Sequence, residues 1–421
     1  MSRYKPYPAY KDSGVEWIGE VPEHWAVRSV KYLYNARLGK MVQPLPKSEK
    51  DVLVPYHRAQ TVQWECIKYD QVESMWANPT EIDTYSLEDG DLLICEGGDV
   101  CRAAMFNRVE RETVIFQNSI HRVRPVGGNH PEWLLRLMQH VRSSGWIDVL
   151  CNKNTIVHFT SDKLASLECP NPPCSEQSEI LSALGRETAH IDALIAKKTR
   201  FIGLLKEKRQ ALISHAVTKG LNPNVKMKDS GVEWIGEVPE HWCIKPIWAI
   251  VSCNDNILSE STNEDFIFRY VDISSVNHTD GITRTEEMKF SNAPSRARRI
   301  AKLGDVIVST VRTYLKAVAS IDNKHADCIF STGFAVLRGR ETIIRPSFLK
   351  WLILNDLLIQ AIESHSEGLS YPAINATELV KLKTVIPPLS EQQTIADFLD
   401  RETGRIDTLT EKTQRSINLL K

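Results

Sequence analysis

The segment KDSGVEWIGEVPEHW, residues 11–25, decides the fold of this chain, because the same fifteen residues return at 228–242. We call each copy the signature segment. A second pair of matching segments follows, since Pro172–Gln177 reads PPCSEQ and Pro387–Gln392 reads PPLSEQ. Fifteen identical residues in one run do not arise by chance. The sequence therefore contains an internal duplication, and its two halves are expected to share one architecture.

The duplication divides the chain into conserved and variable parts. We expect a conserved N-terminal segment at 1–25, a variable block at 26–170, a helical stretch at 171–220, the repeated signature at 221–242, a second variable block at 243–385 and a second helical stretch at 386–421. In each block a Gly-Asp pair before an apolar run predicts a turn entering a buried strand, at 90–94 and 304–308. Proline opens an amphipathic stretch at 131–141 and 346–362, which predicts a helix.

Heptad spacing marks both helical stretches. The seam positions are Leu184, Thr188, Ile191, Ile195, Lys198, Ile202, Leu205, Arg209, Leu212 and Ala216 in the first stretch, and Leu399, Thr403, Ile406, Thr410, Thr413, Ile417 and Leu420 in the second. This pattern favours two long helices packed against each other over helices that pack only on their own domains. A helix over 175–218 would be about 60 Å long, and the second would be about four turns shorter.

Composition limits the class of protein. The 421 residues include 52 Lys+Arg and 53 Asp+Glu, and 42% are apolar, as in a globular protein. The sequence contains no apolar run long enough for a membrane span and no secretory signal, so we expect no membrane partner. The nine cysteines form no CxxC pair, which favours a reduced cytoplasmic protein without a metal site over a zinc or disulfide protein. A net charge of −1 does not by itself favour a nucleic-acid partner.

These motifs carry a family resemblance over essentially the whole chain. The motifs are GVEWIGEVPEHW at 14–25 and 231–242, the paired PPxSEQ segments, and RETxxID at 186–192 and 401–407. With these motifs, the sequence resembles the specificity (S) subunit of type I restriction–modification systems. The resemblance implies an α+β fold with pseudo-twofold symmetry, in which two target-recognition domains are separated by two antiparallel coiled-coil-like helices. Each domain would read one half of a split DNA target, in defence against foreign DNA.

The resemblance also implies which partners carry the chemistry. Double-stranded DNA would bind this non-catalytic chain, methyltransferase (M) subunits would dock on it, and restriction (R) subunits would join through the complex. S-adenosylmethionine, ATP and Mg would then belong to the partner subunits, with no cofactor in this chain.

Two alternatives to this function stay open. One is a stand-alone methyltransferase or nuclease, because Asn171-Pro172-Pro173-Cys174 resembles the motif with which adenine methyltransferases hold their target base. The stacking aromatic is absent there, and a Gly-rich loop is missing too, so the segment is better read as a Pro-Pro helix entry. The other alternative is an adaptor whose two modules bind protein or RNA.

Candidate DNA contacts lie in polar and basic loops of the variable blocks, where Arg or Lys would face guanine and Asn or Gln would face adenine. These residues are Arg58, Gln60, Arg102, Lys153 and Asn154 in the first block, and Arg269, Arg296, Arg298, Arg299, Arg312, Tyr314, Lys316, Ser370 and Tyr371 in the second. For any one of them, a solvated surface position is an equally good reading.

Candidate partner-docking residues come from the signature segments and the helix seams. They are Trp17, Trp25, Trp234, Trp242, Ile191, Ile195, Ile202, Leu205, Ile406 and Ile417. Large aromatic side chains suit anchoring in a partner's pocket. The alternative for the four tryptophans is that they fasten the signature segment to its own domain.

Overall fold

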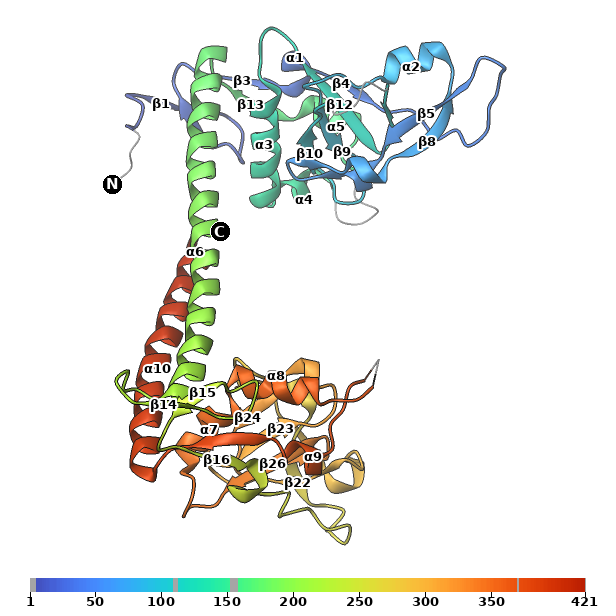
Figure 1. Ribbon diagram of the computed structural model, residues 1–421. Coiled ribbons are helices and arrows are strands. Elements are labelled where there is room, and N and C mark those ends of the chain that lie inside the picture. Colours follow the sequence, from blue (N-terminus) through green and yellow to red (C-terminus); the bar gives the residue numbers. More distant parts are fainter. Residues whose placement is uncertain (1–4, 109–112, 152–157, 369–370, 421) are drawn as a thin grey trace. The chain divides into compact units, whose positions relative to one another are not determined.

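Both halves of the chain build the same four-stranded antiparallel sheet (Figure 1). The computed structural model describes residues 5–108, 113–151, 158–368 and 371–420. The strand order is β10-β9-β12-β4 in the first sheet and β24-β23-β26-β17 in the second, so equivalent strands hold equivalent places. The strands are β4 (Tyr34–Leu38), β9 (Leu92–Cys95), β10 (Ala103–Met105), β12 (Ile120–Pro125), β17 (Val251–Cys253), β23 (Val306–Ser309), β24 (Val318–Ser320) and β26 (Phe334–Gly339).

A second sheet in each half contains one parallel strand pair, β5–β11 and β18–β25. The orders are β11-β5-β8 and β21-β18-β25-β22, so the second half has one extra edge strand. The bounds are β5 (Val52–His57), β8 (Glu73–Ala77), β11 (Ile115–Phe116), β18 (Ile267–Val271), β21 (Glu286–Lys289), β22 (Ala297–Ile300) and β25 (Ile329–Ser331). The registers make His57 the counterpart of Val271, and His121 the counterpart of Ala335.

Three small strand pairs complete each half. The signature segment forms a hairpin, which is β1 (Tyr10–Asp12) with β2 (Glu20–Pro22) and β14 (Met227–Asp229) with β15 (Glu237–Pro239). The other pairs are β3 (Ala26–Ser29) with β13 (Glu168–Asn171), β16 (Cys243–Pro246) with β27 (Lys383–Ile386), β6 (Val62–Gln63) with β7 (Cys66–Ile67), and β19 (Val276–Asn277) with β20 (Gly281–Ile282).

Short helices cover the sheets. They are α1 (Val30–Leu33), α2 (Pro79–Tyr85), α3 (Pro131–Ser143), α4 (Trp146–Leu150), α5 (Ser161–Ser166), α7 (Pro346–Ile353), α8 (Asp356–Ser364) and α9 (Ala376–Leu379). The helix expected over 131–141 is confirmed as α3. The single helix expected over 346–362 is wrong, because two helices occupy this stretch. The Asn355 side chain accepts from the backbone N–H of Leu357 and so caps a new helix, α8, at that point.

The chain forms two compact units, residues 1–191 and 192–421. In the first unit, α3 and the four-stranded sheet bury Trp133, Leu134 and Met138. In the second, α7 buries the counterparts Phe348, Leu349 and Ile353. None of the helices in the described residues is long and apolar enough to cross a membrane.

Two long helices follow the variable blocks, as the heptads predict (Figure 1). They are α6 (Cys174–Lys219) and α10 (Leu389–Leu420), of 46 and 32 residues. Within the second unit, α10 runs antiparallel along the C-terminal part of α6, and the Arg209 Nε lies 3.0 Å from the Asp407 Oδ1. Most seam positions of α10 are buried, namely Leu399, Thr403, Thr413 and Ile417.

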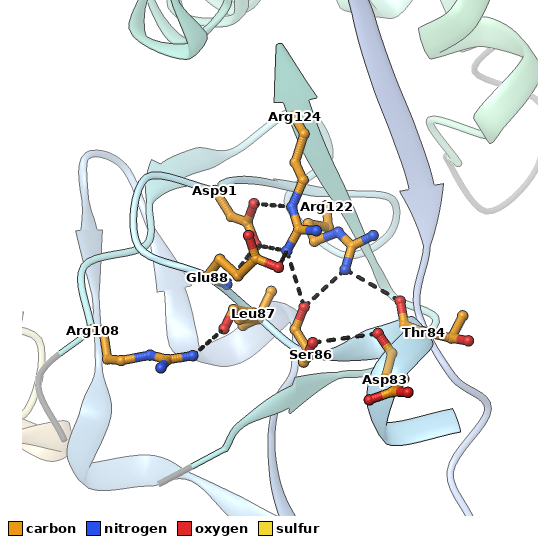
Figure 2. Close-up of polar contacts among 9 residues, drawn as sticks. All are labelled: Asp83, Thr84, Ser86, Leu87, Glu88, Asp91, Arg108, Arg122 and Arg124. Carbon is orange, nitrogen blue, oxygen red and sulfur yellow. Dashed lines mark hydrogen bonds and ion pairs between the residues drawn. The ribbon is translucent and has the colours of Figure 1, made fainter. Parts of the chain in front are cut away.

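A bidentate arginine–aspartate pair fastens the entry of the central strand in both halves. Asp91 accepts from the Nε and Nη2 of Arg124, at 2.6 and 2.9 Å, and Arg338 makes the same two bonds to Asp305, at 3.0 and 2.6 Å. Figure 2 shows the first pair, with Arg122 donating to backbone carbonyls at the end of α2. Both carboxylates are almost fully buried, so these pairs are part of the frame.

The start of each long helix is clamped by the signature segment. The Trp25 indole N–H donates to Glu176 at 3.1 Å and the Trp242 indole N–H donates to Glu391 at 3.0 Å, while His24 and His241 contact the same carboxylates. A carboxylate is favoured there because a helix N-terminus carries partial positive charge.

The next residue of each helix is a glutamine with no exposed surface. Gln177 bonds the carbonyl of Pro172 and the N–H of His130, and Gln392 bonds the carbonyl of Pro387 and the N–H of Arg345. The PPxSEQ motif therefore joins the strand before it, the long helix and the variable block at one point in each half.

Candidate nucleic-acid interface

The loop between β23 and β24, residues 310–317, presents basic and aromatic side chains on a fixed base. Its backbone is bound on both sides, since Thr310 N–H donates to the Gly333 carbonyl and Thr313 N–H to the Pro372 carbonyl. The buried Thr313 hydroxyl also donates to the Ser366 hydroxyl at 2.9 Å. Side chains that leave such a base need little further ordering when they bind a ligand.

Tyr314, on this loop, is 52% exposed. Tyr371 lies on a neighbouring segment and is 66% exposed. The Arg312 guanidinium lies 5.2 Å from the centre of the Tyr371 ring, in a cation–π contact. We call Arg312, Tyr314 and Tyr371 the reading cluster. A guanidinium held beside an aromatic face is suited to a bidentate contact with guanine or to stacking on a base.

Backbone strain marks the same loop. Arg312 and Lys316 have φ of 51° and 50°, in the left-handed region that side chains disfavour. In the first half, Gly98 takes the place equivalent to Arg312, with φ of 75°. Glycine adopts this conformation without steric cost, whereas arginine does not. Strain at an exposed arginine is a feature that binding sites retain.

In the first half the exposed polar tip is Gln60. It lies in the short 3₁₀ turn Ala59–Thr61 that follows β5. This turn is fixed by two contacts to Ala59, because its N–H donates to the Ser119 hydroxyl and its carbonyl accepts from Arg102 at 2.6 Å. An exposed glutamine on a fixed turn is suited to pair with adenine.

Several predicted DNA contacts are engaged inside the protein. Arg102 is mostly buried and holds the Ala59 carbonyl, so its guanidinium is not a free reading group. Arg58 pairs with Glu73 at 2.7 Å, Arg269 pairs with Asp327, and Arg296 pairs with Asp272 at 3.2 Å.

The other predicted contacts differ in accessibility. Arg298 stacks on Phe290 and Arg299 is half-buried on edge strand β22, while Lys316 lies 3.9 Å from Glu363. Lys153, Asn154 and Ser370 lie outside the described residues. The residues predicted from the sequence do not include Val311 and Leu315, two exposed side chains of the loop 310–317. The prediction was based on side chains that can form hydrogen bonds, and these two cannot.

The predicted docking tryptophans lie against their own domains. Trp242 is 1% exposed and hydrogen-bonded to Glu391, and Trp25 is half-buried and bonded to Glu176. Trp17 and Trp234 pack on the cores of the first and second unit. This placement favours the alternative that these rings fasten the signature segment.

The predicted docking residues of the helices divide by burial. Leu205 and Ile417 are buried, whereas Ile191, Ile195, Ile202 and Ile406 are half-buried and keep part of their surface accessible.

Groups that resemble catalytic chemistry have structural partners. The Asn171 side-chain oxygen accepts from Gln177, so the Asn-Pro-Pro segment is a helix entry. All nine cysteines are free thiols, and burial raises the pKa of Cys95 to about 11 and that of Cys101 and Cys169 to about 12. Among the described residues, no group of three or more His, Cys, Asp or Glu side chains has the arrangement of a metal site.

Comparison with known proteins identifies related sequences. The profile of the type I restriction modification DNA specificity domain matches residues 252–419. The chain is 23% identical to the putative type I restriction enzyme MjaX specificity subunit of Methanocaldococcus jannaschii, over 91% of this chain and 87% of that protein. It is 24% identical to the type I restriction enzyme HindI specificity subunit of Haemophilus influenzae over 40% of this chain and 38% of that protein.

Solved structures show the same fold. A chain from a study of complex assembly and conformational transition of the type I R-M system superposes with a TM-score of 0.68, at 14% identity, covering 95% of both chains. The HsdS subunit from Thermoanaerobacter tengcongensis superposes with a TM-score of 0.57, also at 14% identity, covering 95% of this chain and 96% of that one. The expected α+β fold, with two β-rich domains and two long helices packed together, is therefore confirmed.

Proposed function

The chain belongs to the type I restriction–modification specificity subunits, and we propose that it reads a bipartite DNA target through the loops described above. As a specificity subunit it is the non-catalytic, DNA-recognising member of the restriction–modification complex, and it binds no cofactor. We assign residues 26–170 and 243–385 as the two target-recognition domains. Their equal sheet orders and unequal loops support this assignment, because one frame can then present two different reading surfaces.

The reading cluster carries the proposal. Arg312, Tyr314 and Tyr371 are exposed, sit on an immobilised base, and include a strained arginine where the other half has Gly98. Arg298 and Arg299 on β22 would contact phosphates, which fixes position without reading sequence. In the first domain, Gln60 would read a base while Arg58 and Arg102 hold its turn.

We further propose that methyltransferase subunits dock on the two long helices, that restriction subunits join through them, and that the assembly acts in the cytoplasm. The half-buried seam residues Ile191, Ile195, Ile202 and Ile406 support this role, since each leaves apolar surface accessible. The tryptophans of the signature would act indirectly, by holding the helix starts in place. S-adenosylmethionine, ATP and Mg would be bound by those partner subunits.

A domain exchange tests the proposal. Residues 243–385 are replaced by the second recognition block of another specificity subunit, and the adenine methylome of cells carrying the whole complex is sequenced. We expect one half of the split methylation motif to change and the other half to stay. A second strain carries Arg312→Ala, which should relax the sequence requirement in the same half of the motif only. An unchanged motif after the exchange contradicts the proposal, as does methyl transfer by the isolated chain.

A further inference from the structure

Helix α8 is attached at its start to the long helix α6. The Ser214 hydroxyl of α6 donates to the Asn355 side-chain oxygen at 2.6 Å, and the same oxygen accepts from the Leu357 N–H at the first turn of α8, at 3.1 Å. Asn355 is 1% exposed, so water competes little for these bonds. Val217 of α6 and Leu358 of α8 also belong to one buried cluster. The start of α8 is therefore held against α6 by both polar and apolar contacts.

The end of α8 is attached to the loop 310–317, which carries two members of the reading cluster. The Ser366 hydroxyl donates to the Ile362 carbonyl in the last turn of α8 at 2.8 Å, and it accepts from the buried Thr313 hydroxyl of the loop at 2.9 Å. In the same turn of α8, Glu363 lies 3.9 Å from the Lys316 ammonium of the loop. Because the buried threonine stands between two members of the reading cluster in the sequence, the end of α8 determines where those side chains lie.

The first domain holds its equivalent loop, between β9 and β10, in a different way. Asp99 of that loop pairs with Arg142 of α3 at 3.0 Å, and the Cys101 thiol donates to the Met138 carbonyl of the same helix at 3.5 Å. The loop of the first domain is thus fastened to a helix of its own variable block. The loop of the second domain is connected through α8 to the long helix.

We propose that Ser214, Asn355 and Ser366 are positioning residues for recognition of the second DNA half-site. They act through α8, whose nine residues span about 13 Å and connect α6 to the loop of the reading cluster. Base readout requires side chains held to within about 0.5 Å, so loosening either end of α8 reduces discrimination between bases. The inference rests on the reading role proposed above for the cluster, and it adds the residues that hold the cluster in place.

A substitution at the start of α8 tests this in the whole complex. Competition binding uses duplexes with the methylation motif of the wild-type complex, and one base pair is changed in either half. We expect Ser214→Ala to reduce discrimination at the second half-site about fivefold and to leave the first half-site unchanged. Ser214→Thr keeps the hydroxyl and should retain the discrimination. Ser182→Ala is the matched control, because it removes an exposed hydroxyl from the same helix.

A second control separates positioning from a general loss of stability. Ile386→Val removes one methyl group from the buried cluster that α6 and α8 share, but this residue lies on β27, outside α8 and the loop. Urea unfolding compares the stability of this variant with that of Ser214→Ala. We expect Ile386→Val to keep full discrimination at both half-sites even where it is the less stable of the two.

Combining both ends of α8 gives the sharpest readout. Ser366→Ala should also reduce discrimination at the second half-site about fivefold. Residues 214 and 366 contact opposite ends of α8, a separation at which independent substitutions normally have additive effects. We expect the double variant to lose no more than either single variant, because one broken end already disconnects the loop from α6.

Three outcomes overturn the inference. They are wild-type discrimination by Ser214→Ala, additive losses in the double variant, and a loss of discrimination by Ile386→Val equal to that of Ser214→Ala. A wild-type complex without any base preference at the second half-site contradicts the reading role itself. Failure of the proposed function is therefore seen in the wild-type complex, whereas failure of the inference is seen only in the variants.

Discussion

The two recognition domains use arginine differently on one shared frame. Both keep the bidentate pair, Arg124 with Asp91 and Arg338 with Asp305. In the first domain, Arg102 and Arg122 also donate hydrogen bonds to backbone carbonyls. In the second domain, Arg312 is exposed and its backbone has a strained, positive φ. The same frame therefore carries arginine side chains with different surroundings in the two domains. A basic residue in the sequence is therefore informative only once its carbonyl and carboxylate neighbours are known.

The largest expected effect comes from breaking the frame in one domain only. Asp305→Ala leaves the Arg338 guanidinium without its buried carboxylate, so we expect a loss of about 3 kcal/mol in the unfolding free energy of the second domain. Asp91→Ala should act equally on the first domain. Calorimetry with hydrogen exchange at β9 and β23 distinguishes the two domains.

The matched control is Asp322→Ala, because that carboxylate is 58% exposed and its ion pair with His325 should contribute less than about 1 kcal/mol. Equal loss of protection in both domains after Asp305→Ala would contradict their independence.

A second difference between the domains predicts their acid stability. The first domain buries His57 and His121, where the second has Val271 and Ala335. Burial lowers the pKa of His57 to about 4 and also lowers the pKa of His121. In the unfolded chain these histidines keep a pKa of about 6.5, so they bind protons there at a higher pH than in the folded domain. The folded domain is therefore not destabilised by these two histidines above pH 6.5. Stability is lost as the pH falls towards 4, by about 3 kcal/mol for His57.

We therefore expect the first domain to unfold at a higher pH than the second. His278 of the second domain also has a pKa lowered by burial, but Asp356 at 3.7 Å partly offsets that shift. His57→Val, which transplants the residue of the second domain, should make the first domain more resistant to acid. Circular dichroism between pH 7 and pH 4, with hydrogen exchange to assign the domains, measures this, and unchanged acid unfolding of the variant would refute it.

The reading cluster should affect one half of the DNA target. Arg312→Ala and Tyr371→Ala each remove one partner of the cation–π pair and one exposed tip, so we expect a loss of about 1–3 kcal/mol in discrimination at the second half-site. Gln60→Ala should act on the first half-site alone. Competition binding with duplexes enriched from a random library by the whole complex measures both. Arg102→Lys, in contrast, should change the stability of the first domain more than its sequence preference.

The sequence predicts the repeated parts well, because their signals are local. Identical signature segments and heptads place the start of α6 within one residue of Ser175, and the Gly-Asp turns locate β9 and β23. The reading surface depends on distant contacts and is predicted poorly. Whether Arg102 faces solvent depends on the Ala59 carbonyl, 43 positions away in the sequence. The break between α7 and α8 was missed, although Asn355 and Asp356 interrupt the apolar run at that point.

The smallest effect tests why Arg312 stands where the other domain has a glycine. At an ordinary position alanine is more stable than glycine, but at a φ of 51° the order should invert. We therefore expect Arg312→Gly to be about 1 kcal/mol more stable than Arg312→Ala, with neither variant keeping the sequence preference. Gly98→Ala should destabilise the first domain by about 1 kcal/mol for the same reason. A Cβ added at Gly98 meets no atom within 4 Å, so only backbone conformation contributes. Equal stability of the Gly and Ala variants at 312, measured by urea unfolding, would show that this loop relaxes and that the arginine is held there without strain.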